Sequence, residues 1–409
     1  MQVKCFADAP LEWSQGVFSE LAEINPRYML DKNVEYPFVE MASVAEDFGG
    51  IIRFDTRKLE SSGLSRFKED DILFGKITPC AENGKVALVK NLPAEFAIGS
   101  TEFIVLSPKN GNIPYFVYLL ACANPVHGRA VSRMEGSTGR LRITEDVFTK
   151  WLCIPIPSKP EQVAIARILD AVDQAITRTQ EALEKAQKVK RGLMQDIFGD
   201  RKQIAGRIGT HIQEISYGTS QASNDKCHGY PTLRIPNIID GNITISDLTY
   251  VDASARDANQ YALQYGDLLL VRTNGNPNYI GRSAVFQRNN IQQWLYASYL
   301  IRVRFDEALL PRYVDEYLKS ECGRRELFRR VTTSAGNYNI NTMNIKSLPI
   351  PIIGIDKQIK AVQMADAAIQ SIESYNNQCD KLQRLKRGLM QDLLTGKVRT
   401  VQPMEAVIP

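Results

Sequence analysis

The octapeptide KRGLMQDI at residues 190–197 returns almost unchanged as KRGLMQDL at residues 386–393, 196 positions later. Other segments pair at offsets between 194 and 197, such as DILFGK from Asp71 with DLLLVR from Asp267. Matches at one nearly fixed period indicate duplication of a structural unit. The chain is therefore expected to contain two similar domains instead of one continuous core.

Each octapeptide lies near the end of a long heptad pattern. Side chains at unbroken 4-3 spacing predict a coiled-coil seam on a helix of about 38 residues, roughly 57 Å long. In the first copy the seam comprises Ile165, Leu169, Val172, Ile176, Thr179, Leu183, Ala186, Lys190, Leu193 and Ile197. In the second it comprises Ala361, Ala365, Ala368, Ile372, Tyr375, Cys379, Leu382, Lys386, Leu389 and Leu393.

The ends of these helices carry recognisable signals. Ser158 and Glu161 have the spacing of a capping box, and Asp356 is the expected N-cap of the second helix. Gly199 and Gly396 follow the two patterns, as glycine commonly does after a helix.

The simplest partner for each helical stripe is the other helix. The second domain begins where the first helix ends, and domain termini usually lie close together, so the helices are expected to run antiparallel. Short β-rich runs mixed with helical patterns predict α+β domains. The expected fold places two such domains at opposite ends of a long antiparallel two-helix coiled coil, with pseudo-two-fold symmetry. The predicted boundaries are a first domain at 1–157, a helix at 158–199, a second domain at 200–354, a helix at 355–396 and a tail at 397–409.

Composition narrows the classes of protein. The 409 residues carry a net charge of +4, divided as −3 over residues 1–200 and +7 over the remainder, which favours an anionic partner for the second half. No apolar run approaches the ~20 residues that span a bilayer, and the start lacks the layout of a signal peptide. Seven cysteines without a C-x-x-C pair, together with only three histidines, argue against a zinc cluster. The odd and scattered cysteine count predicts a cytoplasmic protein.

Two similar modules on a rigid spacer suit a target that has two marks at a fixed separation. Duplex DNA is such a target, because dimeric readers place their modules about 34–36 Å apart, one helical turn. Similar helices joined to divergent loops would let each end recognise a different base sequence.

Several segments together carry a family resemblance. They are IPIPSKPEQVAIARILDAVDQAI followed by KRGLMQDIF, LPIPIIGIDKQIKAV followed by KRGLMQDLLTGK, and the loops GSTGRLRI and SAGNYNI. On these segments the chain resembles, over essentially its full length, the specificity subunit of type I DNA restriction–modification enzymes. The second copy departs from the family pattern, since GIDKQ replaces the usual Pro and Glu.

The resemblance implies a subunit that catalyses nothing and binds no cofactor itself. It implies recognition of a split, asymmetric site in double-stranded DNA. Methylation subunits that modify adenine with S-adenosylmethionine would dock on the helices, and a restriction and translocase subunit that uses ATP and magnesium would join them. The predicted subunit-docking residues are Lys190, Arg191, Gly192, Lys386, Arg387 and Gly388.

The two glycines of these triplets interrupt helices at a cost of about 1 kcal/mol each relative to alanine. Gly192 and Gly388 occupy matching positions, which predicts close approach by the other helix or by another subunit. The alternative is a tolerated glycine that was inherited through duplication.

DNA contacts require Lys and Arg for phosphates and short polar side chains for base edges, on exposed loops. In the first domain the predicted contacts are Lys76, Thr78, Asn83, Lys85, Ser137, Thr138, Arg140 and Arg142. In the second they are Ser220, Gln221, Lys226, Arg272, Thr273, Asn274, Asn276, Asn278, Tyr279, Arg282, Arg329, Arg330, Ser334, Asn337, Tyr338 and Asn339. Ordinary solvated turns are the competing interpretation, because Asn and Gly occur in any turn.

Two other functions are open at this point. NPNY at residues 276–279 is similar to the motif with which amino-methyltransferases hold a flipped base, which would make the chain a DNA adenine methyltransferase. However, its second proline and a cofactor loop are missing.

A coiled-coil scaffold with two protein-binding end domains fits the helices equally well, and the Arg- and Asn-rich loops favour DNA over it. His127, His211 and His228 are expected to be loop or surface residues.

Overall fold

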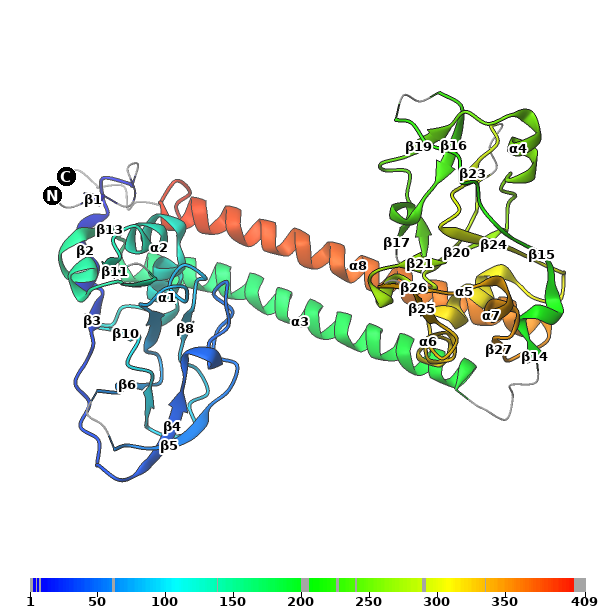
Figure 1. The fold of residues 1–409 in the computed structure, drawn as a ribbon. Coiled ribbons are helices and arrows are strands. Elements are labelled where there is room, and N and C mark those ends of the chain that lie inside the picture. Colours follow the sequence, from blue (N-terminus) through cyan, green and yellow to red (C-terminus); the bar gives the residue numbers. More distant parts are fainter. Residues whose placement is uncertain are drawn as a thin grey trace. The chain divides into compact units, whose positions relative to one another are not determined.

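The computed structural model describes residues 3–4, 6, 9–60, 63–137, 139–199, 206–225, 228–239, 241–288, 292–334 and 336–400. It divides into two compact units (Figure 1), Met1–Thr179 with Gln378–Pro409 and Gln180–Asn377. Each unit mixes helices with small sheets, and each contains a portion of both long helices. The α+β class and the two-domain organisation are confirmed.

The long helices are α3 (Lys159–Phe198) and α8 (Ile355–Leu394), each of 40 residues. Every position of the two predicted seams is buried or half-buried, whereas most positions between them are exposed. The heptad pattern therefore identified the packed face of each helix. No helix in the described ranges is long and apolar enough to cross a membrane.

Helix packing inside each unit shows the direction of the pair. In the first unit, Leu169 near the start of α3 shares a core with Leu393 near the end of α8. In the second unit, Phe198 at the end of α3 shares a core with Ala365 near the start of α8. The start of one helix packs beside the end of the other in both units, so the antiparallel pairing is confirmed.

The predicted capping box through Glu161 and the predicted N-cap at Asp356 are wrong. Glu161 does not close a capping box, because its buried carboxylate instead accepts hydrogen bonds from Trp13 Nε1 at 2.8 Å and from Arg399 Nε at 2.7 Å. A buried carboxylate needs such donors more than the helix end needs a cap. Asp356 lies inside the first turn of α8, which begins one residue earlier, so it is not the N-cap.

The first unit contains four sheets. Their orders are β1-β13-β2, β3-β10-β7-β8, β5-β4-β9-β6 and β11-β12. The strands are β1 (Val3–Lys4), β2 (Ser14–Val17), β3 (Ala22–Ile24), β4 (Glu35–Val39), β5 (Asp55–Lys58), β6 (Ser65–Lys68), β7 (Ile72–Gly75), β8 (Val86–Leu88), β9 (Phe96–Gly99), β10 (Phe103–Pro108), β11 (Glu135–Ser137), β12 (Arg140–Arg142) and β13 (Leu152–Ile156). The helices before α3 are η1 (Phe18–Glu20), η2 (Met41–Ser43), α1 (Pro114–Cys122), α2 (Asn124–Val131) and the π-helix η3 (Val147–Trp151).

The second unit repeats much of this arrangement. Its sheet β15-β24-β20-β22 corresponds to β3-β10-β7-β8, and β21-β26-β25 contains the counterpart of the β11-β12 hairpin. The remaining sheets are β14-β27, β19-β16-β23 and β17-β18. The strands are β14 (Gly206–Arg207), β15 (Ile212–Tyr217), β16 (Tyr230–Leu233), β17 (Ile238–Ile239), β18 (Asn242–Ile243), β19 (Thr249–Val251), β20 (Leu268–Val271), β21 (Thr273–Asn274), β22 (Ser283–Val285), β23 (Leu295–Tyr296), β24 (Leu300–Phe305), β25 (Thr332–Ser334), β26 (Asn337–Asn339) and β27 (Pro349–Ile350). The short helices are η5 (Ile208–His211), η6 (Ile235–Asn237), α4 (Ala255–Gln260), η7 (Pro277–Tyr279), α5 (Pro311–Lys319), α6 (Glu321–Phe328) and α7 (Thr342–Lys346).

In each unit, the two faces of one central strand pack into two different apolar cores. In β7, Ile72 and Leu73 belong to different clusters, and in β20 the same holds for Leu268 and Leu269. Successive side chains of a strand point to opposite faces, so a fully apolar strand fits only where both faces are covered. This explains the continuous apolar runs after Asp71 and Asp267.

A buried glutamine fixes the start of each long helix in the same way. Gln162 Oε1 accepts from Ile113 N at 3.2 Å, and its Nε2 donates to Pro157 O at 3.1 Å. Gln358 Oε1 accepts from Leu310 N at 2.9 Å. The two glutamines are 196 positions apart and make equivalent bonds, so the duplication extends to buried contacts.

Candidate nucleic-acid interface

The first unit brings together two segments that lie about 60 positions apart in the chain. Thr78 N donates to Leu141 O at 3.1 Å, and Ile143 N donates to Lys76 O at 2.8 Å. The β11-β12 hairpin therefore lies against the chain that leaves β7. We call Lys76, Thr78, Glu102, Arg140 and Arg142 the first recognition edge.

The second unit has the same arrangement in the same register. Thr273 of β21 pairs with Asn339 of β26, and Ile340 N donates to Arg272 O at 2.9 Å. We call Arg272, Thr273, Asn274, Asn337, Tyr338 and Asn339, together with Tyr299, the second recognition edge. The predicted segments around Arg272 and Asn337 are thus neighbours in space.

A third segment joins the second recognition edge. Ser298 N donates to Thr219 O at 2.8 Å, and Arg272 N donates to Tyr299 O at 2.9 Å. The predicted contact Ser220 therefore lies beside this edge. Tyr299, whose side chain is 57% exposed, was not among the predicted contacts, because a lone aromatic before an apolar strand carries no local signal.

Some of the predicted contact side chains in the first unit have no partner within the described part of the protein, and others are already bonded. Lys76, Ser137 and Arg140 make no side-chain hydrogen bond or ion pair within the described residues, and Arg140 is exposed. Asn83 and Lys85 instead bond internally, to Glu46 Oε1 at 2.8 Å and Met41 O at 3.0 Å. Thr78 Oγ1 donates to Glu82 Oε1 at 3.2 Å.

Arg142 forms a two-point pair with a carboxylate that the sequence did not indicate. Its Nε and Nη2 donate to the two oxygens of Glu102 at 2.9 and 2.8 Å. The guanidinium holds the pKa of Glu102 below its ordinary value, and the carboxylate raises the pKa of Arg142. Both groups are therefore charged at neutral pH, and the guanidinium plane is fixed.

In the second unit, two arginines stack on tyrosines. The Arg272 guanidinium lies 4.4 Å from the Tyr217 ring centre, and that of Arg282 lies 3.8 Å from Tyr279. Stacking restricts the planar guanidinium and leaves its N–H groups at the rim. Arg282 Nε also donates to Asn278 O at 3.2 Å.

The NPNY segment is a turn held by its own side chains. Asn274 Oδ1 accepts from Asn276 N at 2.8 Å, and Asn276 Oδ1 accepts from Asn278 N at 3.0 Å. These bonds explain the asparagines as turn formers.

The other predicted contacts have different surroundings. Arg330 bonds Glu326 and Ser347, Arg329 pairs with Glu326 at 2.5 Å, and Gln221 Nε2 donates to Asp257 at 2.9 Å. Thr138 and Lys226 lie outside the described residues, and Ser334 is placed on β25 by its backbone alone.

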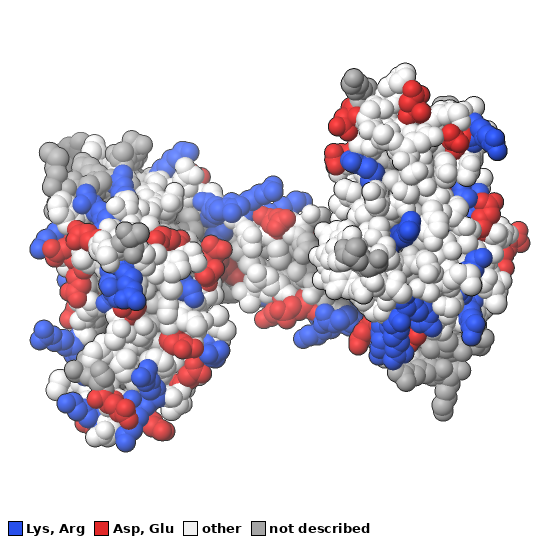
Figure 2. Space-filling model, viewed as in Figure 1, with Lys and Arg blue, Asp and Glu red and all other residues white. Residues whose placement is uncertain are grey.

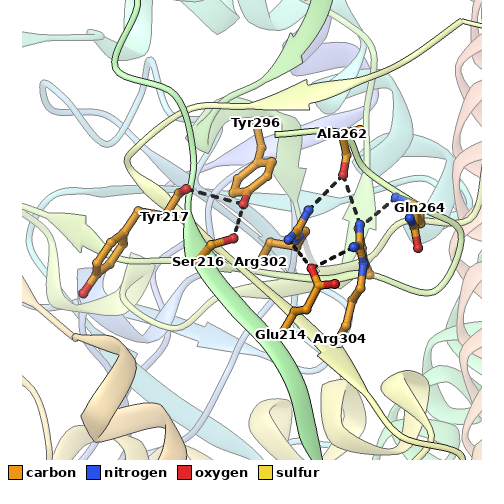
Figure 3. Close-up of polar contacts among 9 residues, drawn as sticks. Glu214, Ser216, Tyr217, Ala262, Gln264, Tyr296, Arg302 and Arg304 are labelled. Atoms are coloured by element: carbon orange, nitrogen blue, oxygen red, sulfur yellow. Dashed lines mark hydrogen bonds and ion pairs between the residues drawn. The ribbon is translucent and has the colours of Figure 1, made fainter. Parts of the chain in front are cut away.

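A polar network between β15 and β24 of the second unit occupies two more arginines. Figure 3 shows Arg302 and Arg304, both from β24, with Glu214 between them. Glu214 Oε2 accepts from them at 2.7 and 2.8 Å, and Ala262 O accepts from both at 2.9 and 3.1 Å. Arg304 also pairs with buried Asp267 at 2.6 Å. These arginines stabilise the sheet whose strand β24 directly follows Tyr299.

Charge alone does not locate the interface. On the face drawn in Figure 2, Lys and Arg are interspersed with Asp and Glu over the first unit. The recognition edges are defined by strand register, which places the same two segments side by side in each unit.

The two predicted docking triplets differ in their contacts. Lys386 Nζ lies 2.7 Å from Asp173 Oδ1, whereas Lys190 makes no ion pair within the described residues. A Cβ added at Gly192 or Gly388 would meet no heavy atom within 4 Å, so the expected close approach by the other helix is wrong. Approach by another subunit stays a prediction.

The first docking triplet lines a pocket of about 670 Å³ in the second unit. Its lining residues are Lys190, Arg191, Gly192, Met194, Gln195, Glu316, Lys319, Ser320, Glu321 and Cys322.

The histidines are dispersed. His127 is 8% exposed in α2 and packs against Phe48 and Phe74, so its expected loop or surface position is wrong. His211 Nδ1 lies 3.1 Å from Asp306. Within the described part of the chain, no three His, Cys, Asp or Glu side chains cluster as a metal site requires.

Residues 10–187 match the family described as the type I restriction modification DNA specificity domain. The type I restriction enzyme EcoKI specificity subunit of Escherichia coli (strain K12) is 24% identical over 60% of this chain and 57% of its own length. The EcoEI specificity subunit of Escherichia coli is 29% identical over 46% of this chain and 33% of its own length. The chain thus matches about half or less of the length of these relatives.

Other relatives are similar over nearly the whole chain. The MjaVIII specificity subunit of Methanocaldococcus jannaschii is 22% identical over 91% of this chain and 89% of its own. Among solved structures, the type I restriction–modification S subunit from M. genitalium has a TM-score of 0.57 at 15% identity, over 96% of this chain and 99% of that one. The HsdS subunit from Thermoanaerobacter tengcongensis has a TM-score of 0.51 at 18% identity, over 95% and 98%. These structures share the fold.

Proposed function

We propose that this chain, which belongs to the family of type I restriction–modification DNA specificity subunits, recognises a bipartite, asymmetric DNA site with one recognition edge per unit. One observation carries the proposal: both units assemble distant polar segments at the same strand edge in the same register. A duplicated scaffold that repeats such an edge suits a target with two marks.

The side chains of the two edges suit different bases. The first edge offers Lys76, Arg140 and Arg142, which suit phosphates and guanine. The second also offers an arginine, Arg272, but adds Asn337 and Asn339 with Tyr299, and amide side chains suit adenine. Because the edges differ while the framework repeats, the two half-sites are expected to differ in sequence.

The chain acts, in this proposal, as the non-catalytic part of a cytoplasmic complex. Methylation subunits dock through α3 and α8 at the triplets beginning at Lys190 and Lys386, and a restriction and translocase subunit joins them. S-adenosylmethionine, ATP and magnesium are held by those partners and not by this chain.

Footprinting of the chain with its methylation subunits tests the proposal. Two short protected blocks separated by an unprotected spacer are expected, and one continuous block or none would favour a protein-docking scaffold. Arg272→Ala should weaken protection. Arg256→Ala, at an exposed position of α4 that does not belong to the second recognition edge, is the matched control and should leave it unchanged.

Exchange of residues 205–350 for the corresponding domain of another family member tests modularity. The DNA sequence of only one half-site should change in a methylation map. If both halves change together, the two units do not act as independent readers.

A further inference from the structure

We propose that Arg142 recognises a guanine in the half-site contacted by the first unit, with Glu102 as the positioning residue that orients its guanidinium. This inference rests on the proposed function and names one base that the first recognition edge selects.

The pair leaves the edge of the guanidinium that contains Nη1 and Nη2 free to donate to a base. Glu102 takes the Nε–H and one N–H of Nη2, at 2.9 and 2.8 Å. Both N–H groups of Nη1 and the outer N–H of Nη2 remain, and the Arg142 side chain has no other hydrogen-bond partner within the described residues. Nη1 and Nη2 thus present two parallel donors on the edge of the plane that faces away from Glu102. Guanine offers two matching acceptors, O6 and N7, in the major groove.

The place of Arg142 in the fold suits contact with a base. It ends β12 and forms a bridge with Ile77, and its side chain is 45% exposed, against 24% for Glu102. The exposed Arg140 lies on the same strand. Lys76 N donates to Glu102 O at 2.9 Å, so a second cation lies next to the pair. A cation beside a base-reading arginine suits a phosphate.

A purely structural role explains the pair less well. The hairpin is already held by the backbone bonds of Thr78 with Leu141 and of Ile143 with Lys76. A partly exposed ion pair contributes little to the free energy of unfolding. Its main effect here is to fix the orientation of the Arg142 guanidinium. A carboxylate that fixes a guanidinium plane lowers the entropy lost when that plane meets a base.

The second unit lacks this device at the same register. The hairpin positions are offset by 197, so Asn339 takes the place of Arg142 and Tyr299 that of Glu102. An arginine held by a carboxylate at this position is therefore expected to select guanine in one half-site and not in the other.

The test uses the full chain in complex with methylation subunits and maps the methylated sites of each variant. With Arg142→Ala, one guanine position in one half-site should become degenerate, with a loss of about tenfold to hundredfold in discrimination, while the other half-site is unchanged. Glu102→Gln keeps the arginine and should weaken the same preference less. Arg140→Ala, on the same strand without a carboxylate partner, should weaken binding without making that position degenerate.

A base analogue supplies an independent measurement. DNA with 7-deazaguanine at that position lacks the N7 acceptor, so it should bind the unaltered complex more weakly than guanine DNA and bind the Arg142→Ala complex equally. Retention of the other half-site by the variant shows that it is folded. If Arg142→Ala methylates an unchanged bipartite site, the inference about Arg142 is wrong, while the proposed function stands. The same holds if the degenerate position lies in the other half-site. Failure of the unaltered complex to protect any DNA would instead contradict the proposed function.

Discussion

The Lys386 ammonium of α8 lies 2.7 Å from the Asp173 carboxylate of α3, inside the first unit. Tyr115 also donates its hydroxyl to Asp173. In the other copy of the octapeptide, Lys190 takes the place of Lys386, and the position equivalent to Asp173 is Ile369. The same eight residues thus form an interhelical ion pair once and not twice, because the facing helix has diverged.

This difference predicts unequal effects of the same substitution. Lys386→Ala should lower the free energy of unfolding of the isolated chain by about 1 kcal/mol, since it leaves a partly buried carboxylate without its cation. Lys190→Ala should change it by less than about 0.5 kcal/mol. Urea unfolding of both variants measures the difference, and equal losses would contradict a structural role confined to Lys386.

Removal of Arg399 should destabilise the first unit more strongly. Its guanidinium meets the carboxylate of Glu161 at 2.7 and 3.0 Å, and Glu161 is 1% exposed. Arg399→Ala leaves this buried charge with the indole of Trp13 alone and should cost about 2–3 kcal/mol in urea unfolding.

Lys397→Ala is the matched control for Arg399→Ala. Lys397 is 74% exposed and lies 3.4 Å from Asp392, so its loss should have little effect. Addition of Glu161→Gln to Arg399→Ala should restore part of the stability, because the charge that needs a partner is removed. No restoration would show that the arginine acts through packing on Trp13.

The helices and the duplication were predictable because their signals are local. A heptad stripe and a repeated octapeptide can be recognised within a few turns of chain, and positions such as Leu169 and Leu393 are buried as expected. The pairing of the two polar segments in each unit was not deduced. It depends on hairpin register, as between Ile77 and Arg142, which lie 65 positions apart.

Contacts between distant residues account for the missed and mistaken predictions. Glu161 has the spacing of a capping residue, yet its partners Trp13 and Arg399 lie 148 and 238 positions away. Glu102 lies 40 positions from Arg142, in an ordinary turn before β10. No local pattern reports such pairs, because tertiary packing alone brings them together.

The stability of the first unit should fall as the pH drops below about 6.5. Burial lowers the pKa of His127 below its ordinary value, and a hydrogen bond with the backbone of Ala81 offsets this in part. Between the ordinary and the lowered pKa the unfolded state binds more protons, so stability present above pH 6.5 is lost as the pH falls.

His127→Gln removes this titration and should flatten the dependence between pH 6.5 and 5. The slope for one proton is at most about 1.4 kcal/mol per pH unit. Denaturant unfolding at several pH values measures it, with exposed His228→Gln as the control. Parallel curves for the unaltered chain and His127→Gln would refute the assignment.

Alanine at Gly192 and Gly388 should separate the stability of the chain from its assembly. No heavy atom lies within 4 Å of a Cβ added at either glycine, so alanine fits without strain and should stabilise the isolated chain by about 0.5–1 kcal/mol per site. If another subunit approaches the helix closely there, the same methyl group should weaken copurification with the methylation subunits. Ser371→Ala, at an exposed position of α8, is a control that should leave assembly intact. A more stable chain that assembles normally would mean that the glycines are inherited and tolerated, and a less stable chain would mean that they serve the fold itself.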